Sequence, residues 1–208
     1  MTATLLYCYD PMCSWCWGFR PTWNRLQKAL QPLIDEKKLT IQPMLGGLAA
    51  DSDNPMSEEM KTKLENTWQR IQTDLGTDFN FDFWRVNQPR RSTYPACRAC
   101  LVARDAGSED EMYHAIQQAY YLQAKNPSNI ETLVECAEHI GLKAEGFLKA
   151  MDHIKSEGLL EKEIDQARQL GLNSFPSLAV LKGDQLTSIP LDYQDPLTML
   201  TAIKKALS

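Results

Sequence analysis

The first 50 residues alternate between short apolar runs and one long stretch with helical spacing. Residues 3–9 form an apolar run typical of a buried strand, and Asp10-Pro11 ends it. Apolar side chains then recur at helical spacing from residue 14 to about residue 30. This spacing predicts a helix, although Pro21 removes a backbone donor and is expected to make the helix irregular. Polar and apolar residues alternate over 39–45, which predicts a second strand.

The middle of the chain shows helical patterns alone. Ser57 is a predicted N-cap, and it opens a helix that Gly76 ends. Residues 128–131 read Ser-Asn-Ile-Glu, a capping-box pattern that predicts the start of a helix ending near Gly141. Further helices are predicted over residues 93–106, 109–125 and 144–154. We therefore expect a helical block here and no second sheet.

Beyond the helical block, the pattern returns to alternating helix and strand. A helix that stops at Gly171 precedes strands over 177–181 and 185–189, and residues 196–207 predict a final helix. The whole order predicts an α/β fold in which a helical insertion separates two halves of one domain. The expected ranges are residues 1–50 and 156–208 for that domain and 51–155 for the insertion.

The charge pattern excludes several classes of protein. The net charge is −5 with both signs mixed along the chain, which does not fit the basic stripe of a nucleic-acid binder. No apolar run approaches the roughly 20 residues that span a bilayer, and the first residues lack the pattern of an export signal. We therefore expect a cytoplasmic protein that binds neither nucleic acid nor membrane. The sequence does not indicate its oligomeric state.

Cys13-Ser14-Trp15-Cys16 is the motif that carries chemistry. The pair stands between a strand and a helix, where unpaired N–H groups and the helix dipole favour a thiolate at Cys13. Cys16 lies one turn further on, where it can attack a mixed disulfide and release the substrate. We therefore predict that Cys13 is the exposed nucleophile and Cys16 the buried resolving thiol. Ser14 and Trp15 are expected to contact substrate, with Trp15 forming an apolar rim.

The segment Tyr9-Asp10-Pro11-Met12-Cys13-Ser14-Trp15-Cys16-Trp17-Gly18-Phe19 resembles the active-site segment of the DsbA family, in particular its cytoplasmic FrnE-like branch of predicted protein disulfide isomerases. The resemblance extends over almost the whole chain. It implies a thioredoxin-like fold with an inserted all-helical domain. It also implies that Phe175-Pro176 is a cis-proline pair beside the two cysteines and contacts substrate.

The chain departs from the periplasmic DsbA pattern in three respects. Ser14-Trp15 replaces the Pro-His pair whose histidine helps to stabilise the thiolate, so strong oxidising power is not expected. Phe175 is bulky at a position where small or β-branched residues are common, which is expected to narrow peptide binding. The export signal of the periplasmic oxidants is also missing.

A second CxxC motif, Cys97-Arg98-Ala99-Cys100, lies in an alanine-rich helix. Two buried core thiols are the simplest interpretation, because cysteine is among the most buried residue types. Two alternatives stay open, namely a second redox pair and a zinc ion shared with Cys13 and Cys16. No metal is expected, since the two motifs are far apart in sequence. The remaining cysteines, Cys8 and Cys136, are predicted core residues, and His114, His139 and His153 are predicted surface residues.

Three functional hypotheses follow from these motifs. The first is an enzyme, a thiol–disulfide oxidoreductase that reduces or isomerises protein or peptide disulfides and also accepts small thiols as partners. The second is a glutathione-dependent isomerase or transferase of the kappa-class type on the same fold. The third is a zinc-holding or chaperone-like binding module without catalysis. No cofactor is expected beyond glutathione as a reductant or ligand, because the sequence holds no phosphate loop or nucleotide fingerprint.

Overall fold

Residues 2–208 are described by the computed structural model, and within them four strands form one mixed sheet in the order β2-β1-β3-β4. The strands are β1 (Ala3–Tyr9), β2 (Leu39–Leu45), β3 (Ser177–Lys182) and β4 (Gln185–Ile189). β1 runs parallel to β2 and antiparallel to β3, and β3 pairs antiparallel with β4. All four strands agree with the predicted ranges to within one residue.

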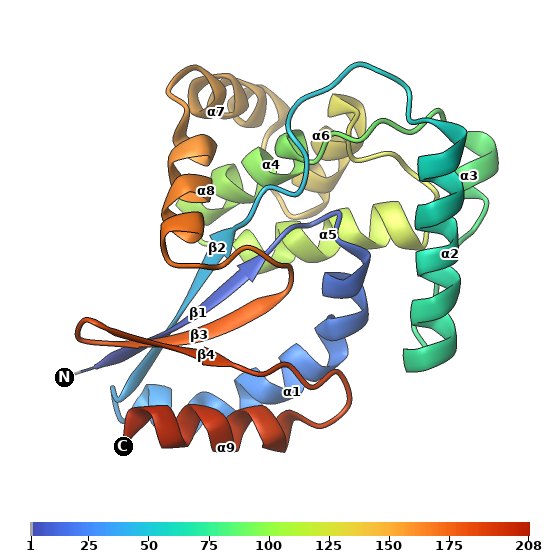
Figure 1. Ribbon diagram of the computed structural model, residues 1–208. Coiled ribbons are helices and arrows are strands. Elements are labelled where there is room, and N and C mark those ends of the chain that lie inside the picture. The colour runs from blue at the N-terminus through green and yellow to red at the C-terminus, as the bar shows by residue number, and fades with distance from the viewer. Residues whose placement is uncertain (1) are drawn as a thin grey trace.

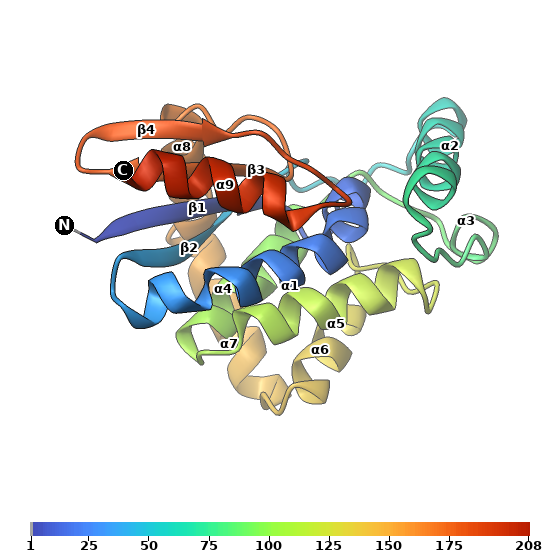
Figure 2. The same ribbon diagram turned by 90° about the horizontal axis from the view of Figure 1, so that it is seen from below.

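Helices cover both faces of the sheet, because the two faces of the central strand β1 are both apolar. Leu5 and Tyr7 belong to the large core cluster, to which α1 (Ser14–Asp35) and α9 (Pro196–Leu207) also contribute. Leu6 and Cys8 point to the other face and pack with Ala167 of α8 (Leu159–Gln169) and with Leu172 just after it. Figure 1 shows α1 and α9 below the sheet and α8 above it, and Figure 2 shows α1 and α9 from below.

The helical block lies between β2 and α8. It contains α2 (Glu58–Leu75), α3 (Phe83–Val86), α4 (Tyr94–Asp105), α5 (Glu109–Tyr121), α6 (Ile130–His139) and α7 (Ala144–Ser156). α4 packs against α5, α6 and α7, while α2 lies beside α1 (Figure 1). The short helix α3 was not predicted, because four residues are too few to produce a periodic pattern. In the part of the chain that the structure describes, no helix combines the length and apolar character needed to cross a membrane.

The structure confirms one predicted cap and contradicts another. The Ser57 hydroxyl accepts a hydrogen bond from the Met60 N–H at 3.2 Å and caps α2. The predicted capping box at residues 128–131 is wrong, because α6 begins without any side-chain cap bond. The Ser128 hydroxyl instead donates to the Ser92 carbonyl at 2.7 Å, so it holds two loops of the helical block together. A contact distant in sequence has replaced the local one.

The first helix continues further than predicted. α1 runs to Asp35 and includes both Pro21 and Pro32. A proline removes one backbone hydrogen bond from a helix interior, but the apolar face of α1 is fully buried on both sides of Pro21. Phe19 and Leu26 are both 0% exposed. Packing of this face against the sheet outweighs the local cost of the proline.

Candidate active site

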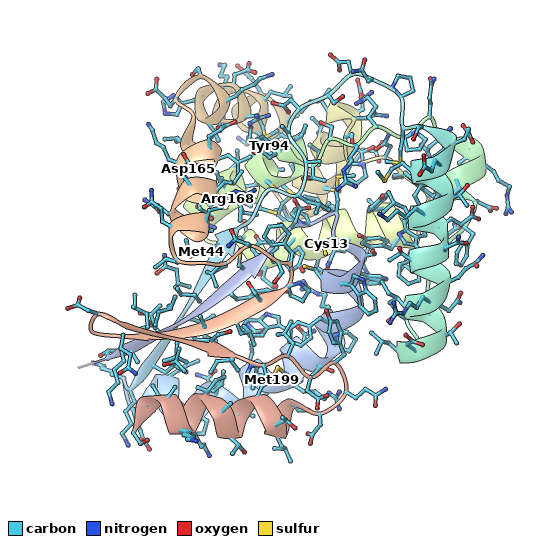
Figure 3. The ribbon with its side chains drawn as sticks, viewed as in Figure 1. Cys13, Met44, Tyr94, Asp165, Arg168 and Met199 are labelled. Carbon is cyan, nitrogen blue, oxygen red and sulfur yellow. The ribbon has the colours of Figure 1, made fainter. Side chains whose placement is uncertain are left out.

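The turn between β1 and α1 places Cys13 at the N-cap of α1. Asp10 builds this turn, since its backbone oxygen accepts from the Cys13 N–H at 3.0 Å and its Oδ1 accepts from the Met12 N–H at 2.8 Å. Figure 3 shows Cys13 where α1 begins, beside the end of β1. The first N–H groups of α1 have no partner within the helix, so this end of the helix carries partial positive charge and favours an anion.

The loop before β3 lies directly against Cys13. The Cys13 thiol donates to the Phe175 carbonyl at 3.3 Å, and the peptide bond between Phe175 and Pro176 is cis, as the resemblance implied. Pro176 is buried, whereas Phe175 is half-buried. Residues separated by more than 160 positions in the sequence therefore meet at the sulfur.

Cys16 lies one turn along α1 and is completely buried. Burial, followed by its hydrogen bond with Cys13 and the charge of that residue, raises the pKa of the Cys16 thiol well above its usual range. Cys16 therefore stays protonated while Cys13 is free. The prediction that Cys13 is exposed is wrong, because Cys13 is only 7% exposed at the edge of the site, while Cys16 is 0% exposed.

The Asp10 carboxylate is a buried junction beneath the site. It is 0% exposed, and its Oδ2 accepts hydrogen bonds from the Leu48 N–H at 2.7 Å, the Thr93 hydroxyl at 2.7 Å and the Cys97 thiol at 3.4 Å. Burial raises the pKa of Asp10 above its usual value, although these hydrogen bonds act in the opposite direction. Sequence reasoning recognised the turn at this residue and not the junction, because the partners come from two distant segments, the loop after β2 and the start of α4.

The second CxxC motif lies in the core beneath this junction. Cys97 and Cys100 are both 0% exposed on α4, and burial is the largest cause that raises the pKa of each thiol well above its usual range. The Cys97 thiol contacts the Asp10 carboxylate, and Asp10 builds the turn before Cys13, so Asp10 connects the second motif to that turn. Within residues 2–208, no group of three or more histidine, cysteine or acidic side chains is arranged to hold a metal ion. A redox role for the second pair stays a prediction.

A cleft of about 390 Å³ opens beside Cys13. Its walls come from the β1–α1 turn, from α2, from the segment before α4 and from the loop before β3. The lining residues include Met12, Cys13, Ser14, Trp15, Leu48, Met56, Met60, Lys63, Leu64, Arg90, Arg91, Asn173, Ser174 and Phe175. The cleft is therefore mainly apolar, with cationic side chains among the lining residues.

The residues predicted to bind substrate differ in their exposure and in their contacts around this cleft. Trp15 is half-buried, packs edge-on against Tyr193 and has the Arg70 guanidinium 5.7 Å from its ring centre. Ser14 lines the cleft but is only 9% exposed. The Phe175 ring packs against the backbone of Gly46, where an added Cβ atom would lie 1.8 Å from the ring.

The other predicted residues fall into the core or on the surface. Cys8 and Cys136 are buried, as expected. His139 and His153 are exposed, but the prediction for His114 is wrong because that residue is half-buried. The ring of His114 lies 6.5 Å from the Trp17 ring, its Nδ1 has no hydrogen-bond partner, and burial lowers its pKa.

Comparison with solved structures finds the same architecture in two bacterial proteins. A candidate protein disulfide isomerase from Nitrosomonas europaea superposes with a TM-score of 0.82 at 23% identity, covering 100% of this chain and 98% of that one. The cytosolic disulfide reductase DsbM from Pseudomonas aeruginosa superposes with a TM-score of 0.76 at 24% identity, covering 98% of each chain. That reductase has also been solved with glutathione.

Comparison of sequences points to the same family. The ClpXP adapter protein SpxH of Bacillus subtilis is 24% identical over 175 residues, which are 81% of this chain and 55% of that protein. The chain thus spans about half the length of the curated relatives that it matches. The family model described as a DSBA-like thioredoxin domain matches residues 4–203. The protein has a DsbA-like thioredoxin fold with a helical insertion, and the chain belongs to the DSBA-like thioredoxin domain family.

Proposed function

We propose that this protein is a thiol–disulfide oxidoreductase that reduces or isomerises protein or peptide disulfides in the cytoplasm. One observation carries the proposal. The Cys13 sulfur lies at the N-terminus of α1 on the edge of a cleft, and the buried Cys16 thiol lies one helical turn behind it. Membership of a DsbA-like family and structural neighbours described as a disulfide reductase and a candidate isomerase support it.

The reaction begins when the Cys13 thiolate attacks one sulfur of a substrate disulfide. A Cys13–substrate disulfide forms, the substrate S–S bond breaks, and the leaving thiolate takes a proton from water. Cys16 then loses its proton and attacks the Cys13 sulfur, which releases the second substrate thiol and leaves a Cys13–Cys16 disulfide. The substrate gains two electrons from the enzyme. Two molecules of a small thiol such as glutathione then reduce the Cys13–Cys16 disulfide in two exchange steps, restore both enzyme thiols and leave as their own disulfide.

The residues around the two sulfurs have separate tasks in this scheme. The N–H groups at the start of α1 stabilise the negative charge on Cys13. The high pKa of Cys16 keeps that thiol protonated until the mixed disulfide has formed. Phe175 presents its carbonyl at the reacting sulfur, where an extended substrate segment would pair with the backbone.

The test replaces one cysteine at a time and measures each variant in an insulin-reduction assay with glutathione as the reductant. Cys13→Ser should abolish turnover, and Cys16→Ser should accumulate a mixed disulfide that mass spectrometry detects. Cys136→Ala, which changes a buried thiol on α6, is the matched control and should keep full activity. Activity that persists in Cys13→Ser would refute the proposal.

A glutathione-dependent isomerase or transferase is the second candidate. The Pseudomonas aeruginosa reductase with which this chain superposes has been solved with glutathione, which favours a glutathione site on this fold. That chemistry needs no resolving thiol, however, so it does not account for a buried Cys16 behind Cys13. Saturable glutathione binding, with turnover that survives Cys16→Ser, would favour this candidate over the first.

A further inference from the structure

The charged residues that line the cleft all have the same sign. They are Lys63 on α2 and Arg90 and Arg91 in the segment before α4, and no acidic side chain among residues 2–208 lines the cleft with them. The chain as a whole has a net charge of −5, so the charge of the cleft lining is opposite in sign to that of the chain. A local positive field beside a reacting sulfur attracts anionic groups from solution.

These three cations have no carboxylate partner. None of them takes part in an ion pair within residues 2–208. The buried arginines elsewhere behave differently, since Arg98 is paired with Asp51 and Glu161. The fold therefore neutralises its core cations and leaves those of the cleft without a counter-charge.

Arg90 is held firmly in spite of its unpaired charge. Its guanidinium donates from Nη2 to the Ser128 carbonyl at 2.6 Å and to Asn129 Oδ1 at 2.9 Å, while its buried Nε has no partner. A backbone bridge to Pro55 fixes the segment that carries it. Both acceptors are neutral, so the guanidinium charge is positioned without being compensated.

The apolar part of the cleft is rich in methionine. Met12, Met56 and Met60 line it together with Leu48, and the Arg91 guanidinium lies 3.7 Å from the Met60 sulfur. Methionine side chains are flexible and fill irregular spaces, so such a surface accepts ligands of varied shape. The apolar lining therefore gives little selectivity among ligands, and the three cations are the groups that can supply it.

We propose that this cleft selects disulfide substrates that carry carboxylates next to the reacting cysteine. The occupant that we infer is an acidic, cysteine-containing peptide segment, with its sulfur at Cys13 and its carboxylates toward Lys63, Arg90 and Arg91. The inference rests on the proposed function, since it needs a disulfide substrate at Cys13. Opposite charges across a contact raise association rates and specificity, and salt weakens them when they are exposed.

The experiment measures single-turnover reduction by the fully reduced protein, which needs no other reductant. Three octapeptides are prepared as mixed disulfides with the same fluorescent thiol, and glutamate, glutamine or lysine flanks the cysteine. We expect the glutamate peptide to react about tenfold faster than the glutamine peptide at low salt. The lysine peptide should be the slowest, and 0.5 M salt should reduce the differences.

Charge-reversed variants test the assigned residues. Lys63→Glu and Arg91→Glu change exposed side chains, so we expect them to fold normally and to reverse the order of the three peptides. Lys28→Glu is the matched control, because Lys28 is exposed on α1 about 20 Å along the helix from Cys13. This control should keep the preference of the unmodified protein for the glutamate peptide.

The outcomes separate this inference from the proposed function. Equal rates for the three peptides would overturn the inference and leave the exchange reaction intact, whereas no reaction with any peptide would overturn the proposed function. Oxidised glutathione and its diethyl ester form a second arm of the test. A preference for free carboxylates in that arm supports the same recognition for small thiols, and a preference among the octapeptides supports it for protein segments.

Discussion

Replacement of Asp10 by alanine tests whether the buried carboxylate holds the active-site turn in place. Its two oxygens accept from the N–H groups of Met12 and Leu48 and from the side chains of Thr93 and Cys97. These partners lie in the turn before Cys13, in the loop after β2, and at the start of α4. The carboxylate therefore holds together three segments that are distant from one another in the sequence.

The size of the effect follows from the donors that lose their acceptor. In the described part of the chain, the N–H groups of Met12 and Leu48 have no other partner, whereas the Thr93 hydroxyl also contacts the Ala49 carbonyl at 3.3 Å. Each buried donor left without a partner costs about 1–3 kcal/mol. Removal of a buried carboxylate, whose pKa burial raises, offsets part of this loss. We expect the free energy of unfolding to fall by about 2–4 kcal/mol.

Urea unfolding with linear extrapolation measures this loss, and the rate of Cys13 alkylation by iodoacetamide reports on the turn itself. Asp10→Ala should change both quantities, because the Met12 N–H no longer holds the turn. Asp105→Asn, at the exposed end of α4, removes the same charge and should change neither. A loss below about 0.5 kcal/mol with unchanged alkylation would refute the reasoning.

The titration of Asp10 gives a second readout. Burial raises the pKa of Asp10 in the folded protein above 3.8, so the folded state holds this proton more tightly than the unfolded state does. The associated stabilisation is complete below pH 3.8 and is lost as the pH rises through the folded-state pKa. The stability of the unmodified protein relative to Asp10→Asn should therefore decrease as the pH rises from about 4. A difference that increases with pH would contradict the assigned direction.

Three further results are expected. Gly46→Ala would bring a Cβ to 1.8 Å from the Phe175 ring, so we expect a loss of about 1–3 kcal/mol and slower disulfide exchange. The control Gly146→Ala, which has open space around its Cβ in α7, should stabilise the protein by about 0.5–1 kcal/mol in thermal unfolding. Alkylation of the reduced native protein by iodoacetamide at pH 8 should modify one fast thiol, Cys13, since burial raises the pKa values of the other five. A second fast thiol would contradict this assignment. Burial lowers the pKa of His114, so the midpoint of its NMR titration should lie below pH 6.5. The neutral ring then contributes stability that is present above pH 6.5 and is lost as the pH falls. His114→Gln should therefore weaken the decline in stability on the acid side, and an unchanged decline would exclude this contribution.

The positions of the strands and of most helices could be predicted from the sequence because their causes are local. The run over residues 3–9 is apolar on both faces, and it forms the central strand β1. Ser57 and Gly76 bound α2 through contacts within their own turns of the chain. The CxxC motif at Cys13 likewise stands between a strand and a helix, and that placement depends only on adjacent segments.

Elements whose partners are distant could not be predicted in this way. Ser128 bonds to the Ser92 carbonyl instead of capping α6, and α1 continues beyond residue 30, through Pro32, to Asp35. A local pattern records only the interactions available within a few residues. Tertiary contacts replace those interactions wherever burial makes them stronger.

The sequence alone therefore determined the strand–helix framework and the two sulfurs that we propose to carry the chemistry. Only the tertiary structure decided what surrounds them, namely the buried Asp10 junction and a cleft lined by unpaired cations from α2 and the segment before α4. The physical reason is that the hydrogen bonding of a buried carboxylate and the field within a cleft depend on distances between segments. Those distances are set when the helical block packs against the sheet.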